Sequence, residues 1–256
     1  YYATSEYDNG IQMSAFGTIE NTEFATQYEQ SERVKQIRRL NPESCVDDKK
    51  DINILRNRMF YEAEQTLLKN KDTNIAFIEA PTGAGKSNLA MNCSLKLLDK
   101  NINKIFYVYP FNTLVEQNYD TLEKIYGQTD IFKSIAVINS ITPIPLNGTR
   151  KFWENLDIEE NEKFYQKALL DRQFLNYPFI LTTHVNLFQI MFGCEREAAI
   201  SFYQLAGSVV VLDEIQSYKN VLWTEIMMFL QCYSRLLNMK IIIMSATLPD
   251  LSQLVD

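Results

Sequence analysis

The residues best suited to chemistry lie in one short segment, Ala80–Ser87, which reads Ala-Pro-Thr-Gly-Ala-Gly-Lys-Ser. Its two glycines let the backbone curl so that amide groups face a phosphate. The lysine can then reach the β- and γ-phosphates, and the serine hydroxyl can bind Mg²⁺. We therefore predict an ATP site formed by Thr82, Gly83, Ala84, Gly85, Lys86 and Ser87, with Ser87 as a metal ligand.

The phosphate-binding interpretation has one departure and one alternative. The first position, Ala80, is glycine in the strict pattern. The alternative is an ordinary glycine-rich turn. However, the segment follows a strand-like run and opens a helix-like stretch, which is the setting that a phosphate-binding loop requires.

Two adjacent carboxylates, Asp213 and Glu214, follow the apolar run 209–212. A carboxylate at a strand end can hold Mg²⁺ through water, and its neighbour can orient and deprotonate an attacking water molecule. A pair of this kind is common at strand ends, so its meaning depends on the loop upstream. We expect Asp213 to be a metal ligand, Glu214 the general base, Lys86 the third catalytic residue, and Gln216 a nucleotide contact.

Three further turns follow strand-like runs. The turn Ser245-Ala246-Thr247 is expected to couple the nucleotide to a second binding surface. The turns after 104–109 and 179–181 offer hydroxyl groups and free main-chain amides to a phosphate backbone; ordinary helix caps are the alternative. The candidate nucleic-acid contacts are Pro110, Phe111, Asn112, Thr113, Gln117, Thr182, Thr183 and His184.

The elements that position these turns alternate along the chain. Short apolar, β-branched runs predict strands at Ile75–Glu79, Lys104–Tyr109, Ser134–Ile138, Phe179–Thr183, Ser208–Leu212 and Lys240–Met244. Amphipathic stretches predict helices at Glu29–Leu40, Ile52–Lys69, Ser87–Leu98, Thr113–Tyr126 and Val221–Leu237. This alternation predicts an α/β fold with a mostly parallel sheet flanked by helices, preceded by a helical and irregular N-terminal segment. Ligands of such sheets bind beyond the carboxyl ends of the strands.

Net charge and chain length limit the class of protein. The 256 residues fit one large domain or two small ones, and their net charge is −7. An acidic chain does not grip nucleic acid by charge alone. Main-chain amides and helix N-termini can still hold a phosphate backbone, so the charge weakens the nucleic-acid interpretation without excluding it.

The cysteines and the apolar runs favour a cytoplasmic protein. Cys45, Cys93, Cys194 and Cys232 form no close pair, which argues against a zinc site or a disulfide framework. We expect each of them to be a small buried residue. No apolar run approaches the roughly 20 residues of a membrane span, and the chain opens without a secretory signal pattern or an initiator Met, which suggests a piece of a longer protein.

Taken in order, these motifs resemble those of superfamily 2 helicases of the DEAD/DExH kind. The corresponding segments are motif I at Ala80–Ser87, Ia at Pro110–Gln117, Ib at Thr182–His184, II at Asp213–Gln216 and III at Ser245–Thr247. The resemblance implies that residues 51–256 form the first RecA-like P-loop lobe, which uses ATP and Mg²⁺. For the adenine base the residues leave Gln65, Arg56 and Arg58 as candidates.

A narrower resemblance is to the helicase–nuclease effector of type I CRISPR systems. It is carried by Tyr109–Leu114, Asp213–Tyr218 and Ser245–Pro249, and Tyr1–Tyr7 is similar to the tail of that family's HD nuclease domain. It implies an ATP-driven single-stranded DNA translocase recruited by a CRISPR RNA-guided surveillance complex. Residues 1–50 would then be a linker and the tail of the nuclease domain.

The same resemblance implies parts that this chain lacks. A chain whose only histidine is His184 cannot hold an HD nuclease site, and the second RecA-like lobe would follow motif III. Two alternatives stay open: another DExD/H helicase acting on RNA or in DNA repair, and a protein that uses ATP as a switch for partner binding.

Overall fold

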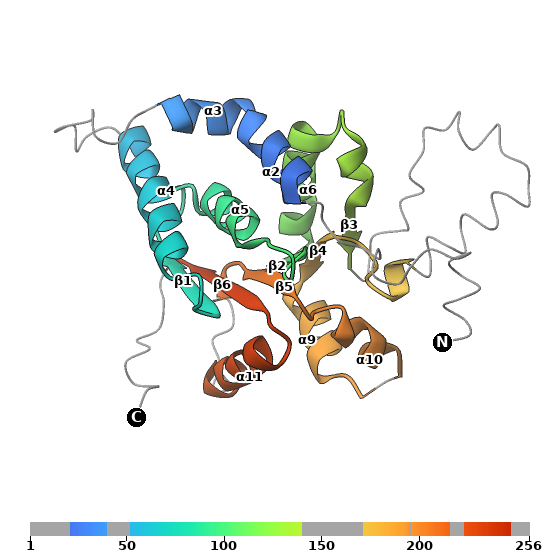
Figure 1. The fold of residues 1–256 in the computed structure, drawn as a ribbon. Helices are drawn as coiled ribbons and strands as arrows, with labels where there is room; N and C mark the ends of the chain where they lie inside the picture. The colour runs from blue at the N-terminus through green and yellow to red at the C-terminus, as the bar shows by residue number, and fades with distance from the viewer. Residues whose placement is uncertain (1–20, 40–51, 140–170, 195, 216–222, 247–256) are drawn as a thin grey trace, which may run out of the picture.

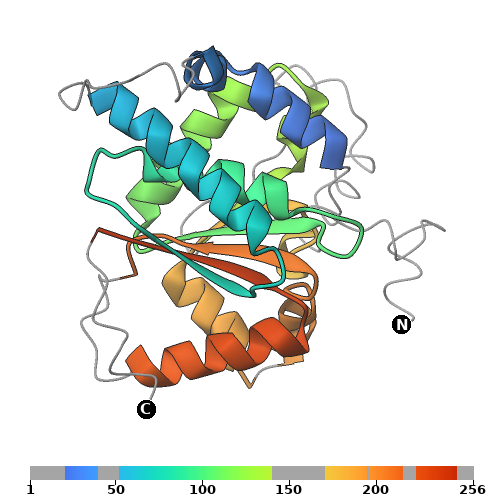
Figure 2. The same cartoon turned by 60° about the vertical axis from the view of Figure 1, so that its left-hand side comes forward.

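A six-stranded sheet forms the centre of the computed structural model, which describes residues 21–39, 52–139, 171–194, 196–215 and 223–246 (Figures 1 and 2). The strands are β1 (Ile75–Glu79), β2 (Lys104–Tyr109), β3 (Ile135–Ile138), β4 (Phe179–Thr183), β5 (Ser208–Leu212) and β6 (Lys240–Ser245). Their order across the sheet is β1-β6-β5-β2-β4-β3, and every pairing is parallel. The predicted α/β fold with a parallel sheet is therefore confirmed.

Helices cover both faces of the sheet (Figures 1 and 2). One face carries α2 (Asn21–Gln30), α3 (Glu32–Arg39), α4 (Ile52–Lys69), α5 (Lys86–Leu97), α6 (Asn112–Tyr126) and the short 3₁₀ helix η3 (Asp130–Ser134). The other face carries α9 (His184–Phe192), α10 (Arg196–Tyr203) and α11 (Trp223–Leu236). Because both faces are covered, the central strands β2 and β5 are mostly apolar rather than alternating, and every residue of both strands is buried.

The helices α2 and α3 belong to the same core as the sheet, although they lie within the segment 1–50 that we expect to be a linker. Phe24, Tyr28 and Val34 are buried. The ring of Phe24 stacks on Phe179 of β4 at a centroid distance of 6.1 Å. Residues 21–39 are thus packed into the lobe, and the residues resembling a nuclease-domain tail lie outside the described part of the chain.

Arg38 connects α2 and α3 to α4 and α5 through hydrogen bonds. Its guanidinium donates to Glu29 at 2.8 and 3.1 Å and to Glu64 of α4 at 2.7 Å. The Asn92 amide of α5 donates to the same Glu64 carboxylate at 2.6 Å. The guanidinium also lies over the ring of Phe60 at 5.1 Å. Shared charged hydrogen bonds of this kind fix the relative positions of all four helices.

The helix predicted at Ile52–Lys69 is confirmed as α4, but its buried face does not follow its apolar residues. Ile52 and Leu55 are exposed, whereas Asn57, Phe60 and Glu64 are buried. Apolar periodicity could not identify this face, because Glu64 is buried by its partners on α3 and α5 rather than by its own hydrophobicity.

The cysteine prediction is also partly wrong. Cys93 is buried, as expected, but Cys194 and Cys232 are exposed, and Cys45 lies outside the described residues. Cys232 sits on α11, whose apolar face packs on the sheet through Leu230 while its outer face is open to solvent. Within the described ranges, no helix is long and apolar enough to cross a bilayer.

Candidate nucleotide site at the strand ends

The described parts of the predicted motifs lie at the carboxyl ends of the strands, on one side of the sheet, because parallel strands all point the same way. The sheet order divides this rim into two halves. The strands β1, β6 and β5 lead into the segments at 80–87, 245–246 and 213–215; we call this the P-loop half. The strands β2 and β4 lead into the segments at 110–113 and 184, and together with β3 they form the α6–α9 half.

The loop before α5 has the backbone that phosphate binding requires. Gly83 and Gly85 adopt φ values of +79° and +90°, which side chains disfavour. Gly85 is the N-cap of α5, and no side chain caps the helix there. The first amides of α5 therefore face a cavity with the positive end of a helix dipole behind them.

Lys86 lies at the centre of this loop and contacts the predicted general base. Its Nζ atom donates to the carbonyl oxygen of Ala80 at 3.0 Å and pairs with Oε1 of Glu214 at 3.2 Å. Glu214 adopts φ +50°, a left-handed conformation that costs a non-glycine residue roughly 1–2 kcal/mol. Strain of this kind persists where surrounding contacts hold it and is concentrated at functional sites.

Asp213 is held at the end of β5 by a bond to the next strand. Its amide donates to the carbonyl of Val108 at 2.9 Å. Burial, together with the charge of Glu214, raises the pKa of Asp213 to about 6, and Lys86 only partly offsets this. A positive ion beside the carboxylate would favour its charged form.

The donors at this position fit Mg²⁺. Asp213 and the exposed Ser87 line one cavity. Mg²⁺ typically binds one or two carboxylates and a hydroxyl and completes its shell with phosphate oxygens and water. The described residues hold no cluster of three or more His, Cys, Asp or Glu side chains of the kind that a transition metal selects.

The cavity at the P-loop half has a volume of about 450 Å³. It is lined by Arg33, Arg56, Thr82, Gly83, Gly85, Lys86, Ser87, Asn88, Asn118, Thr121, Asp213 and Glu214. The predicted loop residues and both carboxylates are thus brought together around one space. Ala84 lines the neighbouring cavity instead.

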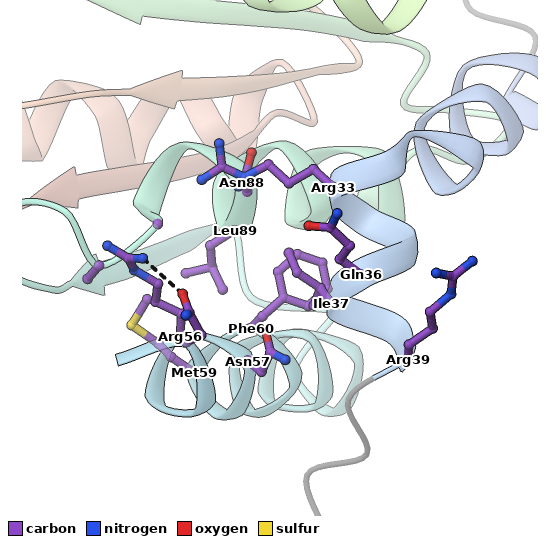
Figure 3. Close-up of a pocket in the computed structure, with 13 residues that line it drawn as sticks. Arg33, Gln36, Ile37, Arg39, Arg56, Asn57, Met59, Phe60, Asn88 and Leu89 are labelled. Atoms are coloured by element: carbon purple, nitrogen blue, oxygen red, sulfur yellow. Dashed lines mark hydrogen bonds between the residues drawn. The ribbon is translucent and has the colours of Figure 1, made fainter. Parts of the chain in front are cut away.

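That second cavity, of about 440 Å³, lies between α3, α4 and α5 (Figure 3). Both cavities are lined by Arg33, Arg56, Gly85 and Asn88. Arg56 donates from its Nε atom to the carbonyl of Gly83 at 2.9 Å. With its amide turned so that the oxygen faces α3, Asn88 accepts hydrogen bonds of 2.6 and 3.1 Å from Arg33.

Several residues that line the two cavities are not predicted from the sequence. Arg33 lies in the segment expected to be a linker, and Asn118 and Thr121 lie one turn apart on α6. Asn88 directly follows the loop, which is the one signal that could have identified it. Of the three adenine candidates only Arg56 lines these cavities; Gln65 and Arg58 are exposed.

In the α6–α9 half, the turn before α6 is open to solvent. Phe111, the N-cap of α6, is 62% exposed and gives no side-chain cap. Thr113 and Gln117 are exposed, and Pro110 and Asn112 are half-buried. This turn therefore presents an aromatic ring, polar groups and free helix amides at the surface.

The turn before α9 is different, and the prediction of side-chain contacts there needs correction. Thr182 and His184 are 1% and 0% exposed. The Thr182 hydroxyl donates to the carbonyl of Ile138 at 2.6 Å, and Thr183 accepts from the amide of Asn186 at 3.4 Å. In these positions the side chains of Thr182 and His184 are not available to a nucleic acid, because the fold uses them internally.

His184 lies at the boundary between the two halves of the rim. Burial lowers its pKa to about 4, although hydrogen bonds with the backbone of Asp213 and Val108 oppose the shift. The imidazole is therefore neutral at pH 7. It lies where the ends of β2, β4 and β5 meet.

The turn after β6 lies beside the phosphate-binding loop. Ser245 is buried and pairs in register with Glu79, and its carbonyl accepts from the amide of Ala80 at 3.2 Å. Ala246 is half-buried. Thr247 and Gln216 lie outside the described residues.

Comparison with known proteins agrees with this arrangement. The model of the DEAD/DEAH box helicase family matches residues 61–254. The CRISPR-associated nuclease/helicase Cas3 of Haloferax volcanii is 23% identical in an alignment of 193 residues that covers 71% of this chain and 20% of that protein. The chain thus spans about a fifth of the length of this curated relative.

Two solved structures have a similar fold. The T. fusca Cas3–AMPPNP structure has a TM-score of 0.55 and 20% identity, covering 74% of this chain and 21% of that one. The DUF1998 helicase MrfA bound to DNA has a TM-score of 0.52 and 15% identity, covering 95% and 28%. Since the family match covers three quarters of its residues, the chain belongs to the DEAD/DEAH box helicase family.

Proposed function

We propose that this chain is the ATP-binding lobe of an ATP-dependent single-stranded DNA translocase or helicase. The observation that carries the proposal is the 3.2 Å contact between Lys86 and Glu214 within the cavity that Ser87 and Asp213 also line. These four side chains are the set that phosphoryl transfer from ATP to water requires.

The contact between Lys86 and Glu214 suggests how nucleotide binding prepares hydrolysis. The phosphates of ATP would compete with Glu214 for the Lys86 ammonium and leave the carboxylate free. Glu214 could then orient a water molecule and take its proton. Ser87 and Asp213 would hold Mg²⁺, which neutralises phosphate charge.

We propose that the base end of the nucleotide occupies the cavity between α3, α4 and α5 (Figure 3). Its apolar lining comes from Ile37, Phe60 and Leu89, and Gln36 and Asn57 offer hydrogen-bonding groups. Apolar walls with a few polar groups are typical of a small-molecule site. Arg33 and Arg56 line both this cavity and the one at the phosphate-binding loop.

Single-stranded DNA is the proposed second ligand, bound along the α6–α9 half of the rim. The exposed turn before α6 offers Phe111, Thr113, Gln117 and main-chain amides. Amides and neutral side chains can bind a phosphate backbone even in a chain with a net charge of −7. The solved structure of the MrfA helicase with DNA supports this choice of ligand.

A role in type I CRISPR interference is the most specific part of the proposal. The curated relative is a CRISPR-associated nuclease/helicase. A second RecA-like lobe and an HD nuclease domain would lie elsewhere in the same protein, and a CRISPR RNA-guided surveillance complex would recruit it. The domain boundary at residue 50 stays a prediction. It changes in one respect: residues 21–39 pack into the lobe and are not a linker. A cytoplasmic location also stays a prediction.

The test is ATP hydrolysis by the full-length protein that contains this chain, with and without single-stranded DNA or RNA, and with Lys86→Ala as the control. We expect strong stimulation by DNA that the variant loses. Stimulation by RNA alone would favour another DExD/H helicase, and hydrolysis indifferent to both would favour an ATP-switched binding module. A further increase on an R-loop held by a surveillance complex, compared with the same R-loop alone, would test the CRISPR assignment.

A further inference from the structure

The two cavities of the nucleotide site share a short stretch of lining, and one of the shared residues is a cation from the N-terminal helices. Both cavities are lined by Arg33, Arg56, Gly85 and Asn88. In the proposed complex, Lys86 meets the β- and γ-phosphates of ATP in the first cavity, and the base fills the second. The anionic group of ATP that lies between these two parts, at the shared residues, is the α-phosphate.

Arg33 is the second residue of α3 and reaches from there to Asn88 on α5 (Figure 3). With the Asn88 amide oxygen directed toward α3, the Nε and Nη2 atoms of Arg33 donate to it at 2.6 and 3.1 Å. The helix that carries Arg33 is held in place on both sides. Val34 is buried in the core, and Arg38 donates to Glu64 of α4 at 2.7 Å. The fold therefore fixes the start of α3 beside the phosphate-binding loop.

The charge of Arg33 is not neutralised by a carboxylate of the described residues, since none of the ion pairs among them includes Arg33. Arg38 on the same helix differs, because it pairs with both Glu29 and Glu64. Asn88 is neutral, and its amide leaves other N–H groups of the Arg33 guanidinium available. Arg33 can therefore bind an anion without giving up an existing ion pair.

Asn88 also belongs to the first turn of α5, where main-chain amides are free. The amide of Leu89 donates to the carbonyl of Gly85 at 3.1 Å and makes the first hydrogen bond of the helix. The helical amides before it have no partner within the helix. The side chain of Asn88 thus holds the Arg33 guanidinium next to a turn that can itself bind phosphate oxygens.

We propose that Arg33 binds the α-phosphate of the nucleotide and that Asn88 is the residue that positions it. A guanidinium forms charge-assisted hydrogen bonds with phosphate oxygens, often two in parallel. This inference rests on the proposed ATP site. It adds to that site a residue of α3, which lies outside all the sequence motifs.

The test is Arg33→Ala in the full-length protein that contains this chain. Affinities for ATP, ADP and adenosine are measured by displacement of a fluorescent ATP analogue. We expect ATP and ADP to lose affinity equally, about tenfold, because both carry the α-phosphate and lose a hydrogen bond to a charged group. The affinity for adenosine, which has no phosphate, should not change. Arg33→Lys should restore only part of the loss, since an ammonium cannot present two parallel donors.

Lys35→Ala is the matched control, because it removes a positive charge from the same helix. Lys35 pairs with Glu32 at 3.7 Å and lines neither cavity. Its removal should leave all three affinities unchanged. The role of Asn88 is tested by Asn88→Ala, which should weaken ATP and ADP binding less than Arg33→Ala does. In the Arg33→Ala background it should have no further effect, since it acts through Arg33.

Three results for Arg33→Ala would overturn the inference: unchanged affinities, a loss confined to ATP, or an equal loss for adenosine. The second would indicate the γ-phosphate, and the third would indicate the base or the ribose. A loss of the same size from Lys35→Ala would also overturn it, because net charge rather than contact would then explain the effect. In each case the ATP site stays intact if Lys86→Ala weakens ATP binding. If the wild type binds ATP no better than Lys86→Ala does, the proposed function itself fails.

Discussion

The two halves of the strand-end rim are built by opposite means. The P-loop half combines charged side chains with left-handed backbone: Gly83, Gly85 and Glu214 have positive φ, and Lys86 pairs with Glu214 next to the buried Asp213. The α6–α9 half has no charged side chain among its predicted contacts. Its helix-capping positions, Phe111 and Thr183, have extended backbone without strain.

This difference shows how an acidic chain can bind two anionic ligands. Charge is concentrated at one point, where a nucleotide's phosphates could be met by a lysine, arginines and a helix N-terminus together. Along the other half, neutral groups and amides would bind a repeating phosphate backbone without adding net charge. If this division is correct, substitutions in one half should leave the ligand of the other half unaffected.

The largest expected effect is that of Lys86→Ala in the P-loop half. It removes the ammonium that would meet the phosphates, and the loss of one partner of such a charge pair costs about 2–5 kcal/mol, or about 30-fold or more in nucleotide affinity. Hydrolysis should fall to background. Nucleotide binding is measured by fluorescence titration and DNA binding by anisotropy without nucleotide. A parallel loss of DNA affinity would break the comparison, because it would mean that the halves are not separate.

Glu214→Gln should separate binding from chemistry within the same half. The amide keeps the shape of the side chain but cannot accept the proton, so hydrolysis should fall about 100-fold or more. ATP affinity should be kept or increased, since Lys86 no longer has an anionic competitor at 3.2 Å. Single-turnover hydrolysis and equilibrium binding on the same preparation check both parts. Hydrolysis at the parental rate would show that another group is the base.

Asp213→Asn should make the unliganded protein more stable while it abolishes activity. The pKa of Asp213 is raised to about 6 in the fold, so the folded state favours the protonated carboxyl and is penalised at higher pH. Relative to the ordinary value of 3.8, this amounts to about 3 kcal/mol at most above pH 6. The variant's melting temperature should exceed that of the wild type at pH 7.5, and the difference should shrink as the pH falls toward 4. A difference independent of pH would contradict the assignment.

The two halves also differ in how well sequence predicts them. The site at the P-loop half depends on residue types that follow strand ends. The apolar runs predict both ends of each of the six described strands to within one residue, so these positions are predicted well. In the α6–α9 half the same logic fails for Thr182 and His184, because nothing in their identity shows that Ile138, 44 positions away from Thr182, already uses the hydroxyl.

The contributions of α3 and α4 could not be predicted for a similar reason. Arg38 and Glu64 stand 26 positions apart, and neither has a neighbour in sequence that indicates the pair. Arg33 reaches the cavities from a segment whose polar composition resembles a linker. Residues that act through distant partners carry no local pattern, so only the folded arrangement shows them.

The smallest expected effect lies in the α6–α9 half, at Phe111. Its ring is exposed and could stack on a base, a contact worth roughly 1–3 kcal/mol. We expect Phe111→Ala to weaken single-stranded DNA binding about fivefold, which is the lower end of that range, and to leave nucleotide affinity and melting temperature unchanged. Tyr203→Ala is the matched control: Tyr203 is 76% exposed but lies at the end of α10, before β5 begins and away from the rim. Equal losses from the two variants would mean that exposed aromatic surface in general, and not the turn before α6, holds the strand.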